Sequence, residues 1–156
     1  MLIATCLIAL FARFSLSPNS YFIQSQQLQQ AAQSLISSLR WAKLQALQTQ
    51  NFIQICSLSN TQECQDSWIN QISIFIDEDG NGELNGEDEL LKTIELPQAV
   101  QINGSRSHIR INNRGFAYGY QQTLYLCENQ QARAITVSAV ANFHVKSAQC
   151  PLADGD

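Results

Sequence analysis

The side chains best suited to chemistry are the oxygen-bearing ones of residues 77–88, which read DEDGNGELNGED. This order follows the calcium loop of an EF-hand, with oxygen ligands at positions 1, 3 and 5, glycine at position 6 and an acidic residue at position 12. Calcium takes about six to eight oxygens from a flexible loop, and this spacing wraps them around one centre. The candidate ligands are Asp77, Asp79, Asn81, Glu83 and Asp88.

A second interpretation of this segment is an acidic, solvated hairpin turn. Asp88 is shorter than the glutamate that usually ends a calcium loop, and strands rather than helices are predicted on both sides. Asn81-Gly82 and Asn85-Gly86 supply the positive φ angles that tight turns require. The turn is the preferred interpretation, so no cofactor is expected, and calcium is kept as the alternative.

The sequence offers little for catalysis. Its two histidines, His108 and His144, each lie in an alternating, strand-like context. No Gly-x-Ser-x-Gly, Cys-x-x-Cys or histidine-rich metal spacing is present. We therefore predict that the protein is not an enzyme.

Five cysteines divide by position. Cys56 and Cys64 lie close together, Cys127 and Cys150 flank the C-terminal β-rich stretch, and Cys6 stands alone in an apolar segment. Four paired thiols would suit a chain that folds in an oxidising compartment. The alternative is a cytosolic protein with five reduced, buried cysteines. Disulfides are favoured because the N-terminal segment also indicates export.

Composition bounds the class of protein. The chain has 156 residues, enough for one domain and one extra element. Its net charge of -4 and pI near 5.0 give no overall positive field for nucleic acid. Only 14% of residues are charged, which fits a domain packed among neighbours in an assembly.

The first sixteen residues, Met1–Leu16, are apolar except for Thr5, Arg13 and Ser15. A transmembrane helix needs about 20 apolar residues, and a signal peptide is the rival interpretation. No basic region precedes the apolar segment and no small-x-small cleavage site follows it. The chain instead continues through Pro18, which would kink a continuous helix.

An amphipathic helix is predicted over residues 25–50. Its apolar positions recur at spacings of 3 and 4, and Gln, Ser, Arg and Lys fill the opposite, solvated face, Ser38 among them. With residues 1–24 as the hydrophobic, transmembrane half, the rod has about fifty residues and spans roughly 75 Å. Such a rod is too long for its own domain to bury, so half of it needs other partners. The apolar positions are Leu28, Ala32, Leu35, Leu39, Ala42 and Ala46.

Residues 51–156 change to a strand-like pattern, with short apolar runs between turn signals. A helix followed only by strands predicts an α+β domain in which the helix covers antiparallel sheet. The eight predicted strands are Phe52–Cys56, Ile72–Ile76, Leu90–Leu96, Val100–Ile102, Ile109–Ile111, Leu124–Cys127, Ala134–Val137 and Phe143–Val145.

The order of these parts resembles the GspH/FimT pseudopilins over nearly the whole chain. The resemblance is carried by the proline after the apolar segment, the helical stripe from Leu35 to Ala46, and the order Cys56, Cys64, Trp68. It continues in Ile74–Asp77 before the acidic turn, in Asn112–Phe116, in Leu124–Cys127 and in Ala132–Ser138.

This resemblance implies a type IV pilin-like fold, a long kinked N-terminal helix packed on antiparallel β-sheets. It implies a single-pass inner-membrane subunit with a periplasmic head at residues 25–156, which meets other pilins or pseudopilins through its helix. Such a subunit primes or caps a type IV pilus or a type II secretion pseudopilus. The pairs Cys56–Cys64 and Cys127–Cys150 would lock the head, and calcium-responsive behaviour is one alternative role.

Two departures from the family pattern stand out. The chain lacks a prepilin leader and a Gly-Phe-Thr-Leu-x-Glu motif, and aligning Pro18 with the kink proline places Met1 where the glutamate belongs. We expect a start assigned too late or a shortened chain. The Gly-Arg-x-Arg motif of DNA-uptake members is replaced by Ala-Asn-Phe-His-Val-Lys at residues 141–146. Nucleic acid is therefore not expected as a partner, and DNA uptake and a periplasmic ligand-binding domain remain alternatives.

Overall fold

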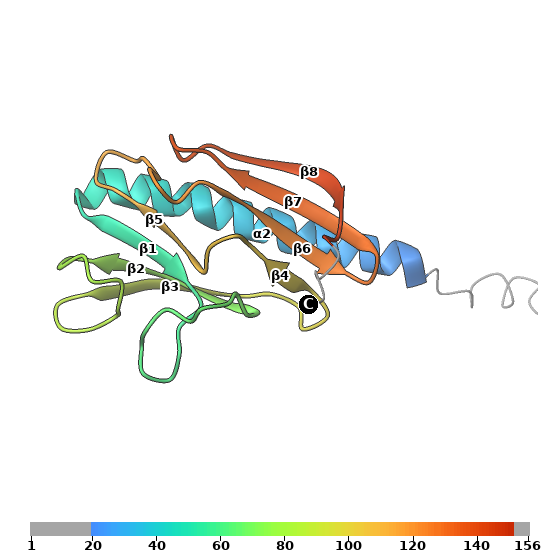
Figure 1. The fold of residues 1–156 in the computed structure, drawn as a ribbon, viewed down its shortest axis with the longest axis horizontal. Coiled ribbons are helices and arrows are strands. Elements are labelled where there is room, and N and C mark those ends of the chain that lie inside the picture. Colours follow the sequence, from blue (N-terminus) through green and yellow to red (C-terminus); the bar gives the residue numbers. More distant parts are fainter. Residues whose placement is uncertain (1–19, 152–156) are drawn as a thin grey trace, which may run out of the picture.

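The structure is a computed structural model that describes residues 20–151 of the chain, and the side chains of residues 23–151. Within these residues, one helix precedes a series of antiparallel strands (Figure 1). The elements are α2 (Ser20–Thr49), β1 (Phe52–Cys56), β2 (Gln71–Asp77), β3 (Glu89–Glu95), β4 (Gln101–Asn103), β5 (His108–Ile111), β6 (Gln122–Glu128), β7 (Gln131–Val137) and β8 (Phe143–Gln149). Each predicted strand overlaps an observed one, which confirms the β-rich assignment.

The strands form two four-stranded antiparallel sheets. The first sheet has the order β3-β2-β1-β5 and the second has the order β4-β6-β7-β8. In the first sheet, Ile53 of β1 pairs with Ile76 of β2 on one side and with Ile111 of β5 on the other. The second sheet is a meander of β6, β7 and β8 with β4 added at its edge.

Helix α2 packs against both sheets, touching β1, β3 and β5 of the first and β6, β7 and β8 of the second. All six apolar positions predicted for its buried stripe are buried. One assignment to the solvated face was wrong: Ser38 is 2% exposed, and its Oγ accepts a hydrogen bond from Lys92 Nζ at 3.0 Å. Because two sheets cover the helix, its buried surface is broader than a single stripe, and Ile36 is buried as well.

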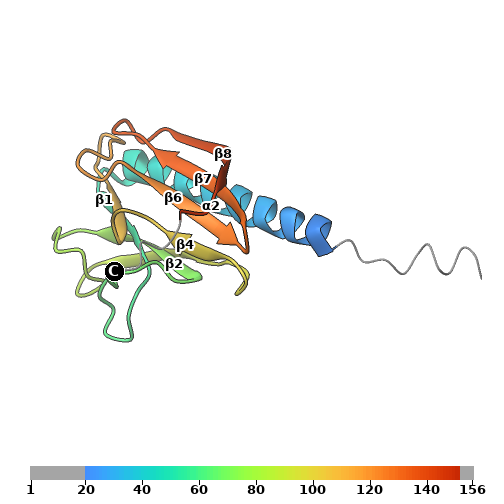
Figure 2. The same ribbon diagram turned by 45° about the vertical axis from the view of Figure 1, so that its right-hand side comes forward.

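The first turns of α2 extend beyond the sheets, as Figure 2 shows. The helix ends at Thr49, whose Oγ1 donates to the carbonyl of Gln45, and Gln50 follows with a φ of 61°. The predicted kink at Pro18 and most of the predicted transmembrane segment, residues 1–24, lie outside the described residues. Within the described part, no helix has both the length and the apolar character to cross a membrane.

Candidate functional site

Polar side chains gather on the outer face of the first sheet, the face turned away from α2. Successive side chains of a strand point to opposite faces, and the isoleucines of β1, β2 and β5 lie in the core that α2 covers. The intervening residues Gln54, Asp77, His108 and Arg110 therefore share the outer face. Loops 57–70 and 78–88 leave a cavity of about 380 Å³ there, lined by Gln54, His108 and Arg110 among others.

Asp77 and Arg110 form the salt bridge of this face, and it is the one salt bridge among the described residues. Asp77 Oδ2 lies 3.0 Å from Arg110 Nη2, and the Asp77 side chain is wholly buried. Burial raises the pKa of Asp77 above its ordinary value of 3.8, and the Arg110 charge acts in the opposite direction. Arg110 also donates to the Gly80 carbonyl at 3.1 Å and stacks on the ring of Phe52.

The acidic loop between β2 and β3 is organised by its own carboxylates. Asp79 Oδ1 accepts from the Asn81 amide at 3.1 Å. Asp88 accepts from the amides of Glu78 and Asn85, at 2.8 and 3.0 Å. The bond between the Glu78 amide and the Asp88 carboxylate holds the two ends of the loop close together.

Glycine is required at two places in this loop. Gly82 has a φ of 84°, and its amide donates to Asp77 Oδ2 at 3.2 Å. Gly80 has a φ of 78°, and a Cβ there would lie 2.8 Å from Arg110 Nη2. These glycines let the main chain pass close to the Asp77–Arg110 pair.

Three of the five predicted ligands converge. One carboxylate oxygen each from Asp77, Asp79 and Asp88 lies within 4.8 Å of the other two. Asn81 Oδ1 is turned toward the loop backbone, where it accepts from the Glu83 amide at 2.6 Å. The Glu83 carboxylate is not part of the converging group.

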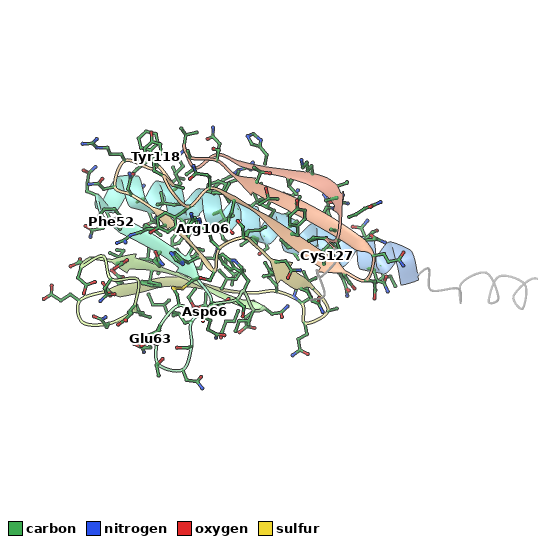
Figure 3. All side chains as sticks on the ribbon, viewed as in Figure 1. Phe52, Glu63, Asp66, Arg106, Tyr118 and Cys127 are labelled. Atoms are coloured by element: carbon green, nitrogen blue, oxygen red, sulfur yellow. A yellow bond between two sulfur atoms is a disulfide. The ribbon has the colours of Figure 1, made fainter. Side chains whose placement is uncertain are left out.

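The acidic loop is attached to a second loop that a disulfide closes. Cys56 is bonded to Cys64. The Leu84 amide donates to the Gln62 carbonyl at 2.9 Å, and Glu63 and Glu83 form an isolated bridge. Figure 3 shows Glu63 and Asp66 on this loop side of the molecule, with Tyr118 at the opposite edge. The position of the acidic loop thus depends on the fold of residues 56–64.

A second disulfide joins Cys150, directly after β8, to Cys127 of β6, with 5.6 Å between the two Cα atoms. Both bonds join the pairs that the sequence analysis proposed. They restrain two separate parts of the head, one in each sheet.

The two histidines have the strand positions expected for them, on β5 and β8. His108 Nδ1 is 3.3 Å from Ser107 Oγ, and its ring lies 5.1 Å from that of Tyr120. Burial lowers the pKa of His108 below 6.5, and the charges of Arg106 and Arg110 add to this effect. Neither histidine bonds to a carboxylate within the described residues, so the geometry of a catalytic triad is not found there.

Helix α2 keeps apolar side chains on its free face. Ile23 is 50% exposed, Leu44 is 55% exposed and Leu47 is 41% exposed. Exposed glutamines and serines lie between them. These exposed apolar side chains could contact a neighbouring molecule.

The segment at residues 141–146 lies in the β7–β8 turn and in β8, beside α2. Lys43 Nζ donates to the Val140 carbonyl at 2.8 Å, and Arg40 donates to the Phe143 carbonyl at 3.4 Å. Arg40 and Lys43 are thus engaged by backbone oxygens, whereas Lys146 within the segment is exposed. Phosphate groups would have to compete with those bonds.

A helix laid across two antiparallel sheets, with a disulfide in each sheet, is the arrangement of a pilin-like fold. The sequence matches the family of type II transport protein GspH over residues 31–141. The chain therefore belongs to the GspH family.

Solved structures share this fold. The type IV minor pilin FimU of Pseudomonas aeruginosa aligns with a TM-score of 0.64 and 18% identity, over 81% of this chain and 96% of that one. The minor pseudopilin EpsH of the Vibrio cholerae type 2 secretion system aligns with a TM-score of 0.55 and 12% identity, over 78% and 97%. A search of curated protein sequences finds no significant match.

The predicted fold class is thus confirmed, and membership of the GspH family supports a structural role in a pilus or pseudopilus. Sequence reasoning found the acidic loop but missed Gln54, His108 and Arg110 as its neighbours on the sheet. The alternation of His108 and Arg110 with Ile109 and Ile111 indicates that these two polar side chains share the outer face of β5. Strand pairing was needed to show that β5 lies beside β1.

Proposed function

We propose that this protein is a minor pilin or pseudopilin that takes part in priming or capping a type IV pilus or a type II secretion pseudopilus. Residues 1–24 anchor it in the inner membrane, and the head lies in the periplasm. Its mechanism is packing: the N-terminal helix leaves lipid and joins the helices of neighbouring subunits.

The observation that carries this proposal is the division of α2 into two faces. One face is sealed in the core by both sheets, whereas Ile23, Leu44 and Leu47 on the other remain exposed. A helix that only completed its own domain would gain little from apolar residues in water. Contacts with neighbouring helices would bury them at about 25 cal/mol per Å² of apolar surface.

The test replaces Ile23 by lysine and uses Gln30→Lys as the matched control. Both positions are exposed on α2, and both changes add one positive charge. In the native cell, deletion of the gene should reduce piliation or type II secretion. The Gln30→Lys variant should restore it, whereas Ile23→Lys at the same membrane level should not.

Fractionation provides the second readout. We expect the chain in the inner-membrane fraction, resistant to alkaline extraction, and co-purified with other pilins or pseudopilins. Normal piliation and secretion in the deletion strain, together with a freely soluble chain, would refute the proposal.

DNA uptake finds less support. Lys43 and Arg40 beside residues 141–146 already donate to backbone carbonyls, and the chain carries a net charge of -4. Affinity for DNA depends largely on cations that neutralise phosphates. A gel-shift assay at physiological salt with the full chain distinguishes this function from the structural one.

A further inference from the structure

A buried carboxylate oxygen at the start of the acidic loop has no partner. The Asp77 side chain is 0% exposed, and its Oδ1 forms no hydrogen bond in the structure. Oδ2 of the same carboxylate is bonded to Arg110 and to the Gly82 amide. Burying a charged oxygen without a partner is costly, so this atom is available to bind a cation.

The carboxylates around it have the spacing of a calcium shell. Oxygens of Asp77, Asp79 and Asp88 lie within 4.8 Å of one another. Calcium binds oxygens at about 2.3–2.6 Å, so two ligands on opposite sides of the ion lie up to about 5 Å apart. One ion at the centre could therefore contact all three carboxylates without a large movement of the loop.

The local charge also fits a divalent cation. Seven of the thirteen acidic residues of the chain lie within residues 77–89. The three converging carboxylates carry three negative charges, and Arg110 offsets one of them. Asp79 and Asp88 form hydrogen bonds but no ion pair with any described residue. Two negative charges therefore remain, which one calcium ion would neutralise.

The short twelfth position of the loop is not an obstacle. Two backbone amides of the loop hold the Asp88 carboxylate inward, so it reaches the other two acids without the extra methylene of glutamate. Gly82 provides the turn at position 6 with a φ of 84°. The aspartates at positions 1, 3 and 12 of the EF-hand order are thus close together in the structure as well.

We propose that residues 77–88 bind a calcium ion, with Asp77, Asp79 and Asp88 as charged ligands. By the order of the loop, the Asn81 side chain and the main-chain carbonyl of Glu83 add two oxygens, and water supplies the rest of the roughly six to eight that calcium takes. Calcium is favoured over magnesium because magnesium demands a near-octahedral shell at shorter distances and gives up its waters reluctantly. This site is independent of the assembly role of α2.

The test uses the full chain in detergent, stripped of metal with a chelator, and calorimetric titration with calcium chloride to about 10 mM. We expect a dissociation constant on the order of 0.1–1 mM, the range of extracellular calcium modules, and a higher melting temperature. Asp79→Ala should weaken binding by about tenfold or more. Glu87→Ala is the control, because it removes one exposed acid from the same loop but none of the three ligands.

Each outcome decides the proposal. Binding to the wild type and to Glu87→Ala, with loss in Asp79→Ala, supports the site. Absence of both heat and thermal shift in the wild type would overturn it. Equal weakening in the two variants would show diffuse attraction to acidic charge, and equal affinity for magnesium would overturn the assignment to calcium. Circular dichroism of each variant verifies that the head is folded.

Discussion

Truncation of Leu39 to alanine tests how firmly α2 is docked in the head. Leu39 is 0% exposed and belongs to the core cluster between the helix and the two sheets. The substitution removes three carbons, whose transfer from water stabilises the fold by about 0.8 kcal/mol each. The cavity left behind adds to this loss, so the free energy of unfolding should fall by about 3–4 kcal/mol. For a head of this size, that corresponds to a fall in melting temperature of roughly 12 °C.

Leu44 on the same helix provides the matched control. It is 55% exposed, so Leu44→Ala should change the free energy of unfolding by less than about 0.5 kcal/mol. Leu39→Met keeps the volume of the side chain and should cost less than about 1.5 kcal/mol. The assay is urea unfolding of the full chain in one detergent, followed by circular dichroism.

The reasoning would be refuted if Leu39→Ala lowered the free energy of unfolding by less than about 1 kcal/mol, because truncation of a fully buried leucine normally lowers it by about 2–5 kcal/mol. It would equally be refuted if Leu44→Ala cost as much as Leu39→Ala. Either result would mean that the sheets do not divide the helix into a sealed face and a free face.

Two further predictions concern stability. Replacing both Cys127 and Cys150 by alanine, which opens a loop with a sequence separation of 23, should destabilise the head by about 3 kcal/mol in urea unfolding. Opening Cys56–Cys64, with a separation of 8, should cost slightly less, about 2.5 kcal/mol, and the reverse order would contradict the loop-length argument. Because burial lowers the pKa of His108, its contribution to stability is complete above pH 6.5 and is lost as the pH falls below that value. His108→Gln should flatten this dependence in melting curves from pH 7.5 to about 5, and an unchanged slope would refute it.

Local sequence patterns were sufficient for the secondary structure. Short apolar runs between turn signals located the strands because the core-facing side of each sheet is covered by α2. The spacing from Leu28 to Ala46 likewise identified the buried side of the helix. Ser38 was misplaced because a single stripe assumes one covering surface, whereas α2 is covered by two sheets.

The site was predictable only where its residues are neighbours in sequence. Asp77, Asp79 and Asp88 belong to one loop, so their spacing alone suggested a common centre. The partner Arg110 lies 33 positions after Asp77 and reaches it only because β5 and β2 both flank β1. The order of strands in a sheet depends on long-range pairing, which no local pattern encodes. The burial of Asp77 Oδ1 without a hydrogen-bond partner also depends on this long-range pairing, so the sequence could not predict it.

The geometry of the first sheet separates assembly from cation binding. Ile53, Ile55 and their neighbours face the core beneath α2, whereas Asp77 and Arg110 lie on the outer face of the same strands. An ion in the acidic loop therefore touches no residue that packs the helix. It would act on the acidic loop and on the loop closed by Cys56–Cys64 that is bonded to it. Asp79→Ala should then reduce calcium affinity without altering the docking of α2, and Ile23→Lys should impair assembly without altering calcium affinity. Loss of both properties in either variant would contradict this separation.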